Sequence, residues 1–248
     1  RQEVVVTIPA SFDEVARELT VAAAKAAGVR RIHLVEEPQA AFYAWLRGGP
    51  EDRPDALPEG ALVLVCDVGG GTTDFTLIEV RGSGAGREFF RTAVGEHLIL
   101  GGDNLDLALA LETERRLGDK PGPGQWTQLL ARCREAKELL LGPEPPESAT
   151  IQILGAGRGI VGAARRIEVR LADAETLLLD GFLPHVGADS SPSVRASGLR
   201  ESGLPYAADA AITRHLAAFL RQHAPGRHPS HVLMNGGFFE SPRVRERL

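Results

Sequence analysis

Two aspartates and three glycines stand close together in one short stretch of the chain. Asp67 follows the apolar run Leu62–Cys66, the glycines Gly69–Gly71 (hereafter the glycine loop) come next, and Asp74 follows two threonines. Successive backbone N–H groups in a glycine turn can form a concave site for an anion. Carboxylates beside such a turn can hold a hydrated Mg²⁺, which prefers oxygen ligands and keeps several of its waters. The stretch therefore predicts a site for a metal-bound phosphate group.

A simpler structure also fits these residues. The run Leu62–Cys66 is typical of a strand buried on both faces, and residues 75–80 roughly alternate, as a returning strand would. The glycine loop would then be only a hairpin turn with acidic caps. We favour the phosphate site because two residues suffice for a plain hairpin turn, and extra glycines weaken both strands.

This hairpin lies within an alternation of expected strands and helices. Apolar runs and turn signals predict strands at Val4–Ile8, Arg31–Val35, Leu62–Cys66, Glu88–Val94 and His231–Met234, and a hairpin of Ala149–Leu154 with Arg166–Arg170. Helical spacing and end signals predict helices over 11–27, 37–46, 103–117, 126–141, 173–183 and 207–223. Ser11 and Glu14 predict a capping box at the start of the first helix, and Asp173 predicts the cap of the fifth. The pattern is that of an α/β protein.

The composition argues against several classes of function. The chain has 248 residues, of which 28 are basic and 33 acidic, and a formal net charge of −5. Mixed charges without aromatic residues among basic clusters argue against a nucleic-acid partner. No apolar run reaches the length of a membrane span, and no signal peptide opens the chain, so we expect a cytoplasmic protein. Cys66 and Cys133 are too few for a disulfide framework.

The octet DVGGGTTD at residues 67–74 resembles the second phosphate loop of the actin-like ATPases, in particular the seventy-kilodalton heat-shock chaperones. Five further motifs follow that family's order: VVVTIPASF at 4–12, EEPQAA at 36–41, LGGDNLD at 100–106, CREAKELL at 133–140 and VLMNGGFFESP at 232–242. The resemblance implies an actin-like ATPase or ribonuclease-H-like fold, mainly its second lobe with the end of the first. Residues 1–58 would end the first lobe, 59–248 would form the second, and 96–168 would be a subdomain inserted in it.

The ends of the sequence predict a piece of a longer protein. Arg1 is not an initiator methionine, and an expected strand begins almost at once. The last residues, after Pro242, begin an expected helix. In the resembled family a first phosphate loop would lie upstream of Arg1, so we expect this piece alone to be inactive as an ATPase.

The resemblance implies roles at the phosphates of ATP or ADP and at Mg²⁺. The N–H groups of the glycine loop, the hydroxyl of Thr72 and the neighbouring Thr73 would hold phosphate. Asp67 and Asp74 would bind the magnesium through water, and Glu37 would place the attacking water. Glu37 also fits a second interpretation, because acidic residues are favoured at a helix N-terminus.

Gly101 and Gly102 would approach the phosphates by backbone, although they also fit an ordinary helix start. The adenosine side would be formed by Arg134, Lys137, Glu138, Leu141, Gly236, Gly237, Phe238 and Glu240. Several of these depart from the family pattern. Glu138 and Glu240 replace two arginines that flank adenine, Leu141 and Phe238 replace serines, and Arg134 replaces a glutamate near the ribose. We therefore expect weak ATP binding and poor discrimination of adenine from guanine.

The implied function is ATP binding and hydrolysis in a heat-shock-70-like chaperone of the stress response. Its partners would be a nucleotide, a downstream peptide-binding or other domain, and co-chaperones. One alternative is a kinase of the same superfamily that phosphorylates a sugar or a carboxylate. The other is a regulator that senses nucleotide without turnover, for which the altered adenine side is the argument.

Overall fold

The computed structural model describes residues 3–48, 57–82, 86–118, 120–153, 164–193 and 207–248. The chain is of the α/β class and divides into two compact units. Unit 1 comprises Arg1–Asp67, Asp74–His97 and Gly226–Asn235, and unit 2 comprises Val68–Thr73, Leu98–Pro225 and Gly236–Leu248. The chain passes between them on both sides of the glycine loop.

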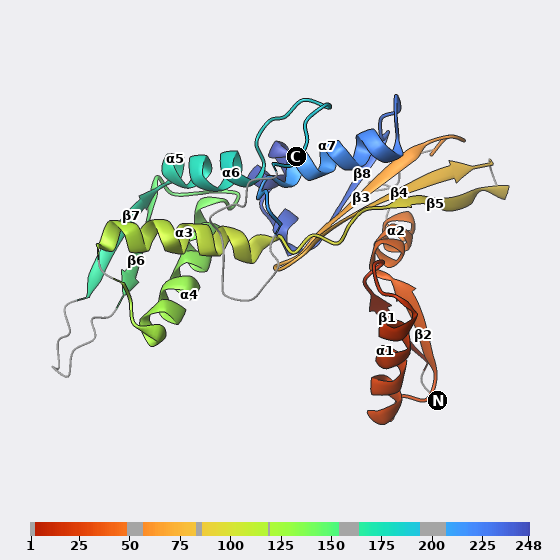
Figure 1. Ribbon diagram of the computed structural model, residues 1–248, viewed down its shortest axis with the longest axis horizontal. Helices are drawn as coiled ribbons and strands as arrows, with labels where there is room; N and C mark the ends of the chain where they lie inside the picture. The colour runs from red at the N-terminus through yellow and green to blue at the C-terminus, as the bar shows by residue number, and fades with distance from the viewer. Residues whose placement is uncertain (1–2, 49–56, 83–85, 119, 154–163, 194–206) are drawn as a thin grey trace. The chain divides into compact units, whose positions relative to one another are not determined.

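Unit 1 contains two sheets and two helices (Figure 1). Strands β1 (Val4–Ile8) and β2 (Ile32–Glu36) pair in parallel, and each is followed by a helix, α1 (Glu14–Ala26) and α2 (Glu37–Arg47). The second sheet has the order β5-β4-β3-β8, with bounds Glu88–Val94, Thr73–Arg81, Leu62–Val68 and His231–Asn235. Strand β3 pairs with β8 in parallel, and β4 pairs with β5 antiparallel.

The core of unit 1 lies between helix α2 and the second sheet. Phe42 of α2 is 1% exposed and packs with Val63, Val65, Ile78 and Val80 of the central strands. Strand β3 is buried on both faces, as its continuous apolar run predicts. This burial fixes the end of β3, where Asp67 lies and after which the glycine loop begins.

Unit 2 contains the long helices and a second hairpin (Figure 1). Its elements are α3 (Gly102–Leu117), α4 (Pro123–Leu140), β6 (Ser148–Ile153), β7 (Arg165–Arg170), α5 (Leu171–Ala174), the π-helical turn η2 (Glu175–Leu179), α6 (Asp180–Phe182), α7 (Ile212–His223), the 3-10 turn η3 (Gly237–Glu240) and α8 (Pro242–Arg247). Helix α4 packs against α3 and β6. The fully buried side chains of Leu129, Cys133 and Leu140 form its inner stripe, as the spacing predicts.

Two predicted helix starts are wrong, and a third helix starts later than predicted. Helix α1 is capped by Asp13, whose carboxylate accepts a hydrogen bond from the N–H of Ala16 (2.8 Å), so Ser11 and Glu14 do not form the capping box. Asp13 is an equally good cap and lies next to the helix start. Helix α5 begins at Leu171 with Arg170 as its N-cap, so Asp173 lies inside it. Helix α7 begins at Ile212.

The apolar stripe expected on α1 is not buried in unit 1. Val15 is 63% exposed and Leu19 is 64% exposed, and no residue of α1 is buried. Helical spacing therefore predicts the helix correctly without telling what covers its apolar side. Most of the connection 48–60 lies outside the described residues, and so does Leu154.

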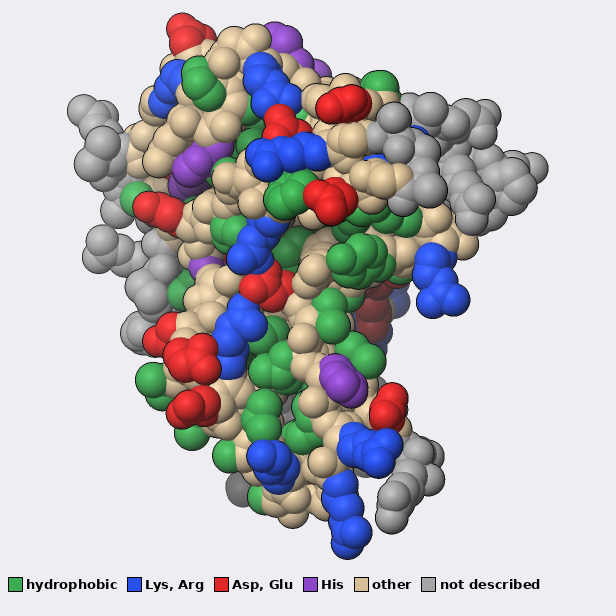
Figure 2. Space-filling model, turned by 90° about the vertical axis from the view of Figure 1, so that its right-hand side faces the viewer, with side chains coloured by type: hydrophobic (Ala, Val, Ile, Leu, Met, Phe, Trp, Pro, Cys, Tyr) green, Lys and Arg blue, Asp and Glu red, His purple; other side chains and the backbone are tan. Residues whose placement is uncertain are grey.

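None of the helices in the described ranges has the length and apolar character needed to cross a membrane. On the face drawn in Figure 2, acidic and basic side chains are interspersed, without a large area of one charge. This agrees with the mixed charges of the sequence.

Candidate functional site

The glycine loop packs against the start of helix α3 in unit 2. The carbonyls of Gly69 and Gly70 accept hydrogen bonds from the N–H groups of Gly102 (3.0 Å) and Asp103 (2.7 Å). These donors belong to the first turn of α3, whose N–H groups have no partner inside the helix. A Cβ atom at Gly101 would lie 2.5 Å from the Gly70 oxygen and 2.7 Å from the Gly69 oxygen. The close approach of the two backbone segments therefore requires glycine at position 101.

Two N–H groups of the glycine loop remain open to a ligand. The N–H of Gly69 donates to the carbonyl of Thr72 (2.9 Å), whereas those of Gly70 and Gly71 have no partner in the described part of the chain. Both residues are exposed. Adjacent backbone donors of this kind can bind an anion. Thr73 is different, because its buried hydroxyl donates to the carbonyl of Leu100 (2.7 Å).

The start of α3 also holds two cations of helix α4. The guanidinium of Arg134 lies 2.6 Å from Asp103 and 2.8 Å from Asp106, and the Lys137 ammonium lies 2.7 Å from Asp106. The side chain of Asp106 is only 3% exposed, so one buried carboxylate balances both cations. The hydrogen bond from Arg134 to the Asp106 carboxylate is the main cause of the raised pKa of Arg134. Lys137 also donates to the carbonyl of Gly102 (3.3 Å).

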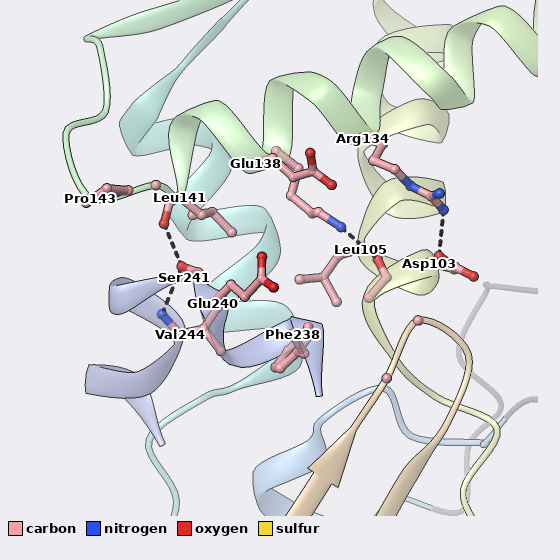
Figure 3. Close-up of a pocket in the computed structure, with 16 residues that line it drawn as sticks. Asp103, Leu105, Arg134, Glu138, Leu141, Pro143, Phe238, Glu240, Ser241 and Val244 are labelled. Atoms are coloured by element: carbon pink, nitrogen blue, oxygen red, sulfur yellow. Dashed lines mark hydrogen bonds and ion pairs between the residues drawn. The ribbon is translucent and has the colours of Figure 1, made fainter. Parts of the chain in front are cut away.

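A cavity of about 480 Å³ lies between these groups and the chain segment after β8 (Figure 3). Its lining residues are Gly69, Gly70, Gly102, Asp103, Leu105, Arg134, Lys137, Glu138, Leu141, Gly142, Pro143, Gly237, Phe238, Glu240, Ser241 and Val244. This set brings together most of the residues predicted for the phosphate loop, the ribose and the base. The predicted residues outside it are Gly71, Thr72, Thr73, Gly101 and Gly236, together with the carboxylates Glu37, Asp67 and Asp74. The volume is within the usual range for a small-molecule site.

The wall of the cavity opposite α3 is a second glycine turn. Gly236 has φ +95°, a left-handed conformation that favours glycine, and turn η3 follows it. Ser241 fixes the end of η3 to helix α4, because its hydroxyl donates to the carbonyl of Leu141 (2.5 Å). The same hydroxyl accepts from the N–H of Val244 (3.3 Å) and so caps α8. Glu240 is thereby held facing α4, and Phe238 lies on the same turn in the wall of the cavity (Figure 3).

Unit 1 carries a separate cluster of carboxyl groups that includes Glu37, Asp67 and Asp74. Burial, and next the charges of Asp67 and Asp74, raise the pKa of Glu37, and His97 opposes them. Burial likewise raises the pKa of Asp67, against a hydrogen bond from Asn235 that lowers it, and the charge of Asp74 adds to the rise. The three predicted catalytic and metal-binding carboxylates are therefore close enough for their charges to interact.

Glu36 and Glu37 have different surroundings, although they are adjacent. The Glu36 carboxylate pairs with Arg17 (2.5 Å) and with Arg91 and is 12% exposed. Glu37 lies in the first turn of α2 and faces the other acids instead. The first turn suits the capping interpretation as well, because a negative charge is favoured there.

The carboxylates fit a hydrated magnesium ion better than a bare one. No group of three His, Cys, Asp or Glu residues within the described ranges is arranged to coordinate a metal ion directly. Carboxyl oxygens whose pKa values are raised by burial and by one another gain from a nearby divalent cation. A donor set of carboxylate oxygens is the kind that Mg²⁺ takes.

His97 is part of this cluster and is not among the residues predicted from the sequence. Its Nδ1 atom lies 2.9 and 3.0 Å from the two carboxylate oxygens of Asp74, within hydrogen-bonding distance of both. The pairing of β4 with β5 could have indicated it. Because Thr76 lies opposite Val94, and Thr73 forms a bridge with Leu98, the register brings His97 beside Asp74.

The comparisons with known proteins agree with the fold. A family model described as Hsp70 protein matches residues 2–141. A chaperone protein HscA homolog of Acidithiobacillus ferrooxidans is 32% identical over 203 residues, which cover 81% of this chain and 28% of that protein. The homolog of Bordetella petrii is 34% identical over 150 residues, 60% of this chain and 22% of its own. The homolog of Shewanella denitrificans is 32% identical over 178 residues, which cover 71% of this chain and 26% of that protein.

The α/β architecture, with a glycine loop between two strands, is that of the actin-like, ribonuclease-H-like class. Within that class, the chain belongs to the Hsp70 family. It spans about a quarter of the length of the curated relatives cited above. Family membership implies a nucleotide as ligand and does not favour the sugar or carboxylate kinase.

Proposed function

We propose that the full-length protein binds ATP and ADP with Mg²⁺, hydrolyses ATP, and acts as a chaperone of the Hsp70 type. The observation that supports this most is the closed contact between the glycine loop and α3. It leaves the N–H groups of Gly70 and Gly71 without a partner among the described residues, and it places Gly69 and Gly70 in the wall of a 480 Å³ cavity. Backbone donors beside a cavity of this size suit a phosphorylated ligand.

The chain's own groups would position and neutralise charge. In this proposal Gly70 and Gly71 donate to phosphate oxygens, and the Thr72 hydroxyl adds a third donor. Asp67 and Asp74 hold the waters of the magnesium ion, which neutralises the charge that develops on the phosphate oxygens. Asp74 is oriented by His97 at 2.9 Å.

Glu37 would orient the attacking water. Its raised pKa in the free protein results chiefly from burial and then from Asp67 and Asp74. A cation between these carboxylates would favour the ionised form of Glu37. An ionised Glu37 can accept a hydrogen bond from the water, and this positions the nucleophile.

The same proposal includes the partners of a chaperone in the cytoplasm. Nucleotide state would control a peptide-binding domain elsewhere in the full-length protein, with co-chaperones setting the rate. A nucleotide sensor without turnover is the second candidate, and the acidic residues Glu138 and Glu240 on the base side of the cavity favour it. A measurement of ATP hydrolysis distinguishes the chaperone ATPase from the nucleotide sensor.

The test uses the full-length protein. Calorimetry with ADP, with and without Mg²⁺, should show one site per chain and tighter binding with the metal, and phosphate release should show turnover of ATP. Gly101→Val is the matched loss-of-site variant, because its side chain would collide with the carbonyls of Gly69 and Gly70. Binding without turnover would leave the sensor, and no binding of ATP or ADP would refute the proposal.

A further inference from the structure

The charged side chains of the cavity are unevenly partnered. Near the glycine loop, Arg134 and Lys137 are both balanced by carboxylates of α3. At the opposite wall, the carboxylate of Glu240 has no ion-pair partner in the part of the chain that the structure describes. The cavity therefore offers neutralised cations near the loop and a free hydrogen-bond acceptor at the far wall.

The position of Glu240 is fixed by its neighbours. Arg245 donates to the backbone carbonyls of Phe239 (2.5 Å) and Glu240 (3.2 Å), which ties turn η3 to helix α8. Ser241, the next residue, is hydrogen-bonded to Leu141 of α4. Figure 3 shows the Glu240 side chain extending from η3 toward α4, between Phe238 and Leu141.

Glu138 contributes a second, weaker negative charge. It lies one turn after Arg134 on α4, lines the cavity, and its charge acts on the Arg134 guanidinium. In Figure 3 its carboxylate is directed along the helix toward Arg134, whereas Glu240 is directed across the cavity. Glu240 is thus the carboxylate that is free to bind a ligand.

We propose that Glu240 reads the base of the bound nucleotide through the N–H groups of that base, and that the site prefers guanine to adenine. This inference rests on the proposed nucleotide-binding function. A carboxylate has only acceptors and can take two parallel N–H bonds. Guanine presents such a pair, N1–H beside the N2 amino group. Adenine presents its N6 amino group beside N1, an acceptor that a carboxylate repels.

The apolar residues of this wall serve either base. Leu141 is 3% exposed and Phe238 is partly exposed, and both line the cavity. An aromatic ring stacks on any base because every base has a π face. Stacking therefore supplies affinity without selecting a base, and the choice depends on the carboxylate.

Glu240 is exposed in the free protein, so it must give up water when the base binds. This limits the expected preference to about tenfold, which corresponds to about 1.4 kcal/mol. The net contribution of hydrogen bonds to charged groups is usually somewhat larger than this, and the exposure of Glu240 places its contribution at the low end.

Calorimetry on the full-length protein should measure GDP, ADP and inosine diphosphate, which lacks the N2 amino group. We expect GDP to bind about tenfold more tightly than ADP, with inosine diphosphate between them. Glu240→Gln should bring GDP and ADP to nearly equal affinity. Glu135→Gln is the control, because Glu135 is an exposed residue of α4 that pairs with Arg132 and is absent from the cavity wall.

Tighter binding of ADP than of GDP, or a Glu240→Gln variant with the wild-type ratio, would overturn the inference and leave the proposed function intact. Absence of binding by all three nucleotides would overturn both. The three nucleotides compared on the wild-type protein decide the matter even if a variant fails to fold.

Discussion

The two ends of the cavity are built from different parts of the polypeptide. At the end near the glycine loop, which we call the phosphate end because phosphate is proposed to bind there, two backbone segments pack against each other. Hydrogen bonds of 2.7 and 3.0 Å join the loop carbonyls to the start of α3. The opposite end is built from the side chains of Glu138, Leu141, Phe238 and Glu240. The first end retains the residues of the resembled family, and the second departs from them.

The physical reason lies in what each end can tolerate. A backbone-built site needs glycine where two segments meet, as at Gly101, and most substitutions there collide with main-chain atoms. A side-chain-built wall can change its chemistry while turn η3 keeps its conformation through Ser241 and Arg245. Ligand preference can therefore change at the second end while the phosphate end stays the same.

The largest expected effect is on catalysis near the phosphate end. In the full-length protein, Asp67→Asn and Thr72→Val should each lower ATP hydrolysis by about a hundredfold or more, because they remove groups proposed to act where charge develops. ADP affinity should change by only a few-fold. Steady-state phosphate release and calorimetry give the two numbers, and Thr72→Ser, which keeps the hydroxyl, should retain turnover.

Wild-type turnover in both variants would remove the phosphate-loop assignment. Equal losses in ADP affinity and in hydrolysis would instead show that Asp67 and Thr72 contribute to nucleotide affinity in general. The proposed difference between the two ends of the cavity would then be wrong.

The second effect tests whether Leu141 and Phe238 can be changed to the serines of the family pattern without loss of stability. Leu141 is 3% exposed, so Leu141→Ser should lower the free energy of unfolding by about 2–4 kcal/mol. Phe238→Ser, at a partly exposed position, should cost less than half as much. Chemical denaturation of the two variants measures both values. A neutral Leu141→Ser variant would mean that the base side can be reverted without repacking.

The third effect compares Gly101, where the glycine loop meets α3, with Gly237, which lines the opposite wall of the cavity. Gly101→Ala should lower the free energy of unfolding by about 1–3 kcal/mol, because its Cβ would lie 2.5 Å from a carbonyl oxygen. It should also weaken ADP binding by displacing the loop. Gly237→Ala is the matched control, since a Cβ there meets nothing within 4 Å. Similar values for the two variants would refute the difference between backbone-built and side-chain-built ends.

The glycine loop and the strands on either side of it could be predicted from the sequence because their signals are local, whereas the binding of phosphate there stays a prediction. A buried apolar strand, three glycines and two acids lie within one hairpin, and the structure confirms strands β3 and β4 on either side of the loop. The contact between the loop and the LGGDNLD segment is not local. The glycine loop and the pair Gly101–Gly102 are about thirty residues apart in the sequence. Only the resemblance to the family implied that both approach the phosphates.

Other features depend on pairings that no local pattern contains. His97 meets Asp74 only through the β4–β5 register, and Asp106 is buried beneath two cations that belong to another helix. Ser11 was predicted as the cap of α1, but Asp13 is an equally good capping residue, and local propensity does not decide between them. Lobe boundaries at residues 58 and 59 remain a prediction.

The smallest expected effect concerns the stability of the protein without ligand. Burial raises the pKa of Glu37 and of Asp67, so the protonated forms of both favour the folded state. This stability is fully present below their unfolded pKa values, about 4, and is lost as the pH rises through the higher folded values. Asp67→Asn removes the contribution of Asp67, so the difference in unfolding midpoint between variant and wild type should move in favour of the variant from pH 4 to pH 7.

Other carboxylates act in the opposite direction and must be separated from this effect. Hydrogen bonds from Arg115 and Arg116 lower the pKa of Glu112 to about 2, so its contribution is lost only as the pH falls from about 4.5 toward 2. Measuring midpoints at pH 4 to 7 and comparing variant with wild type isolates Asp67. An unchanged difference across this range would show that Asp67 costs the folded state nothing. If the difference does move, Asp67→Asn, which is expected to lower hydrolysis, also makes the free protein more stable at neutral pH. The carboxyl cluster of unit 1 would then be kept at a cost in stability, which is expected where a bound cation compensates it.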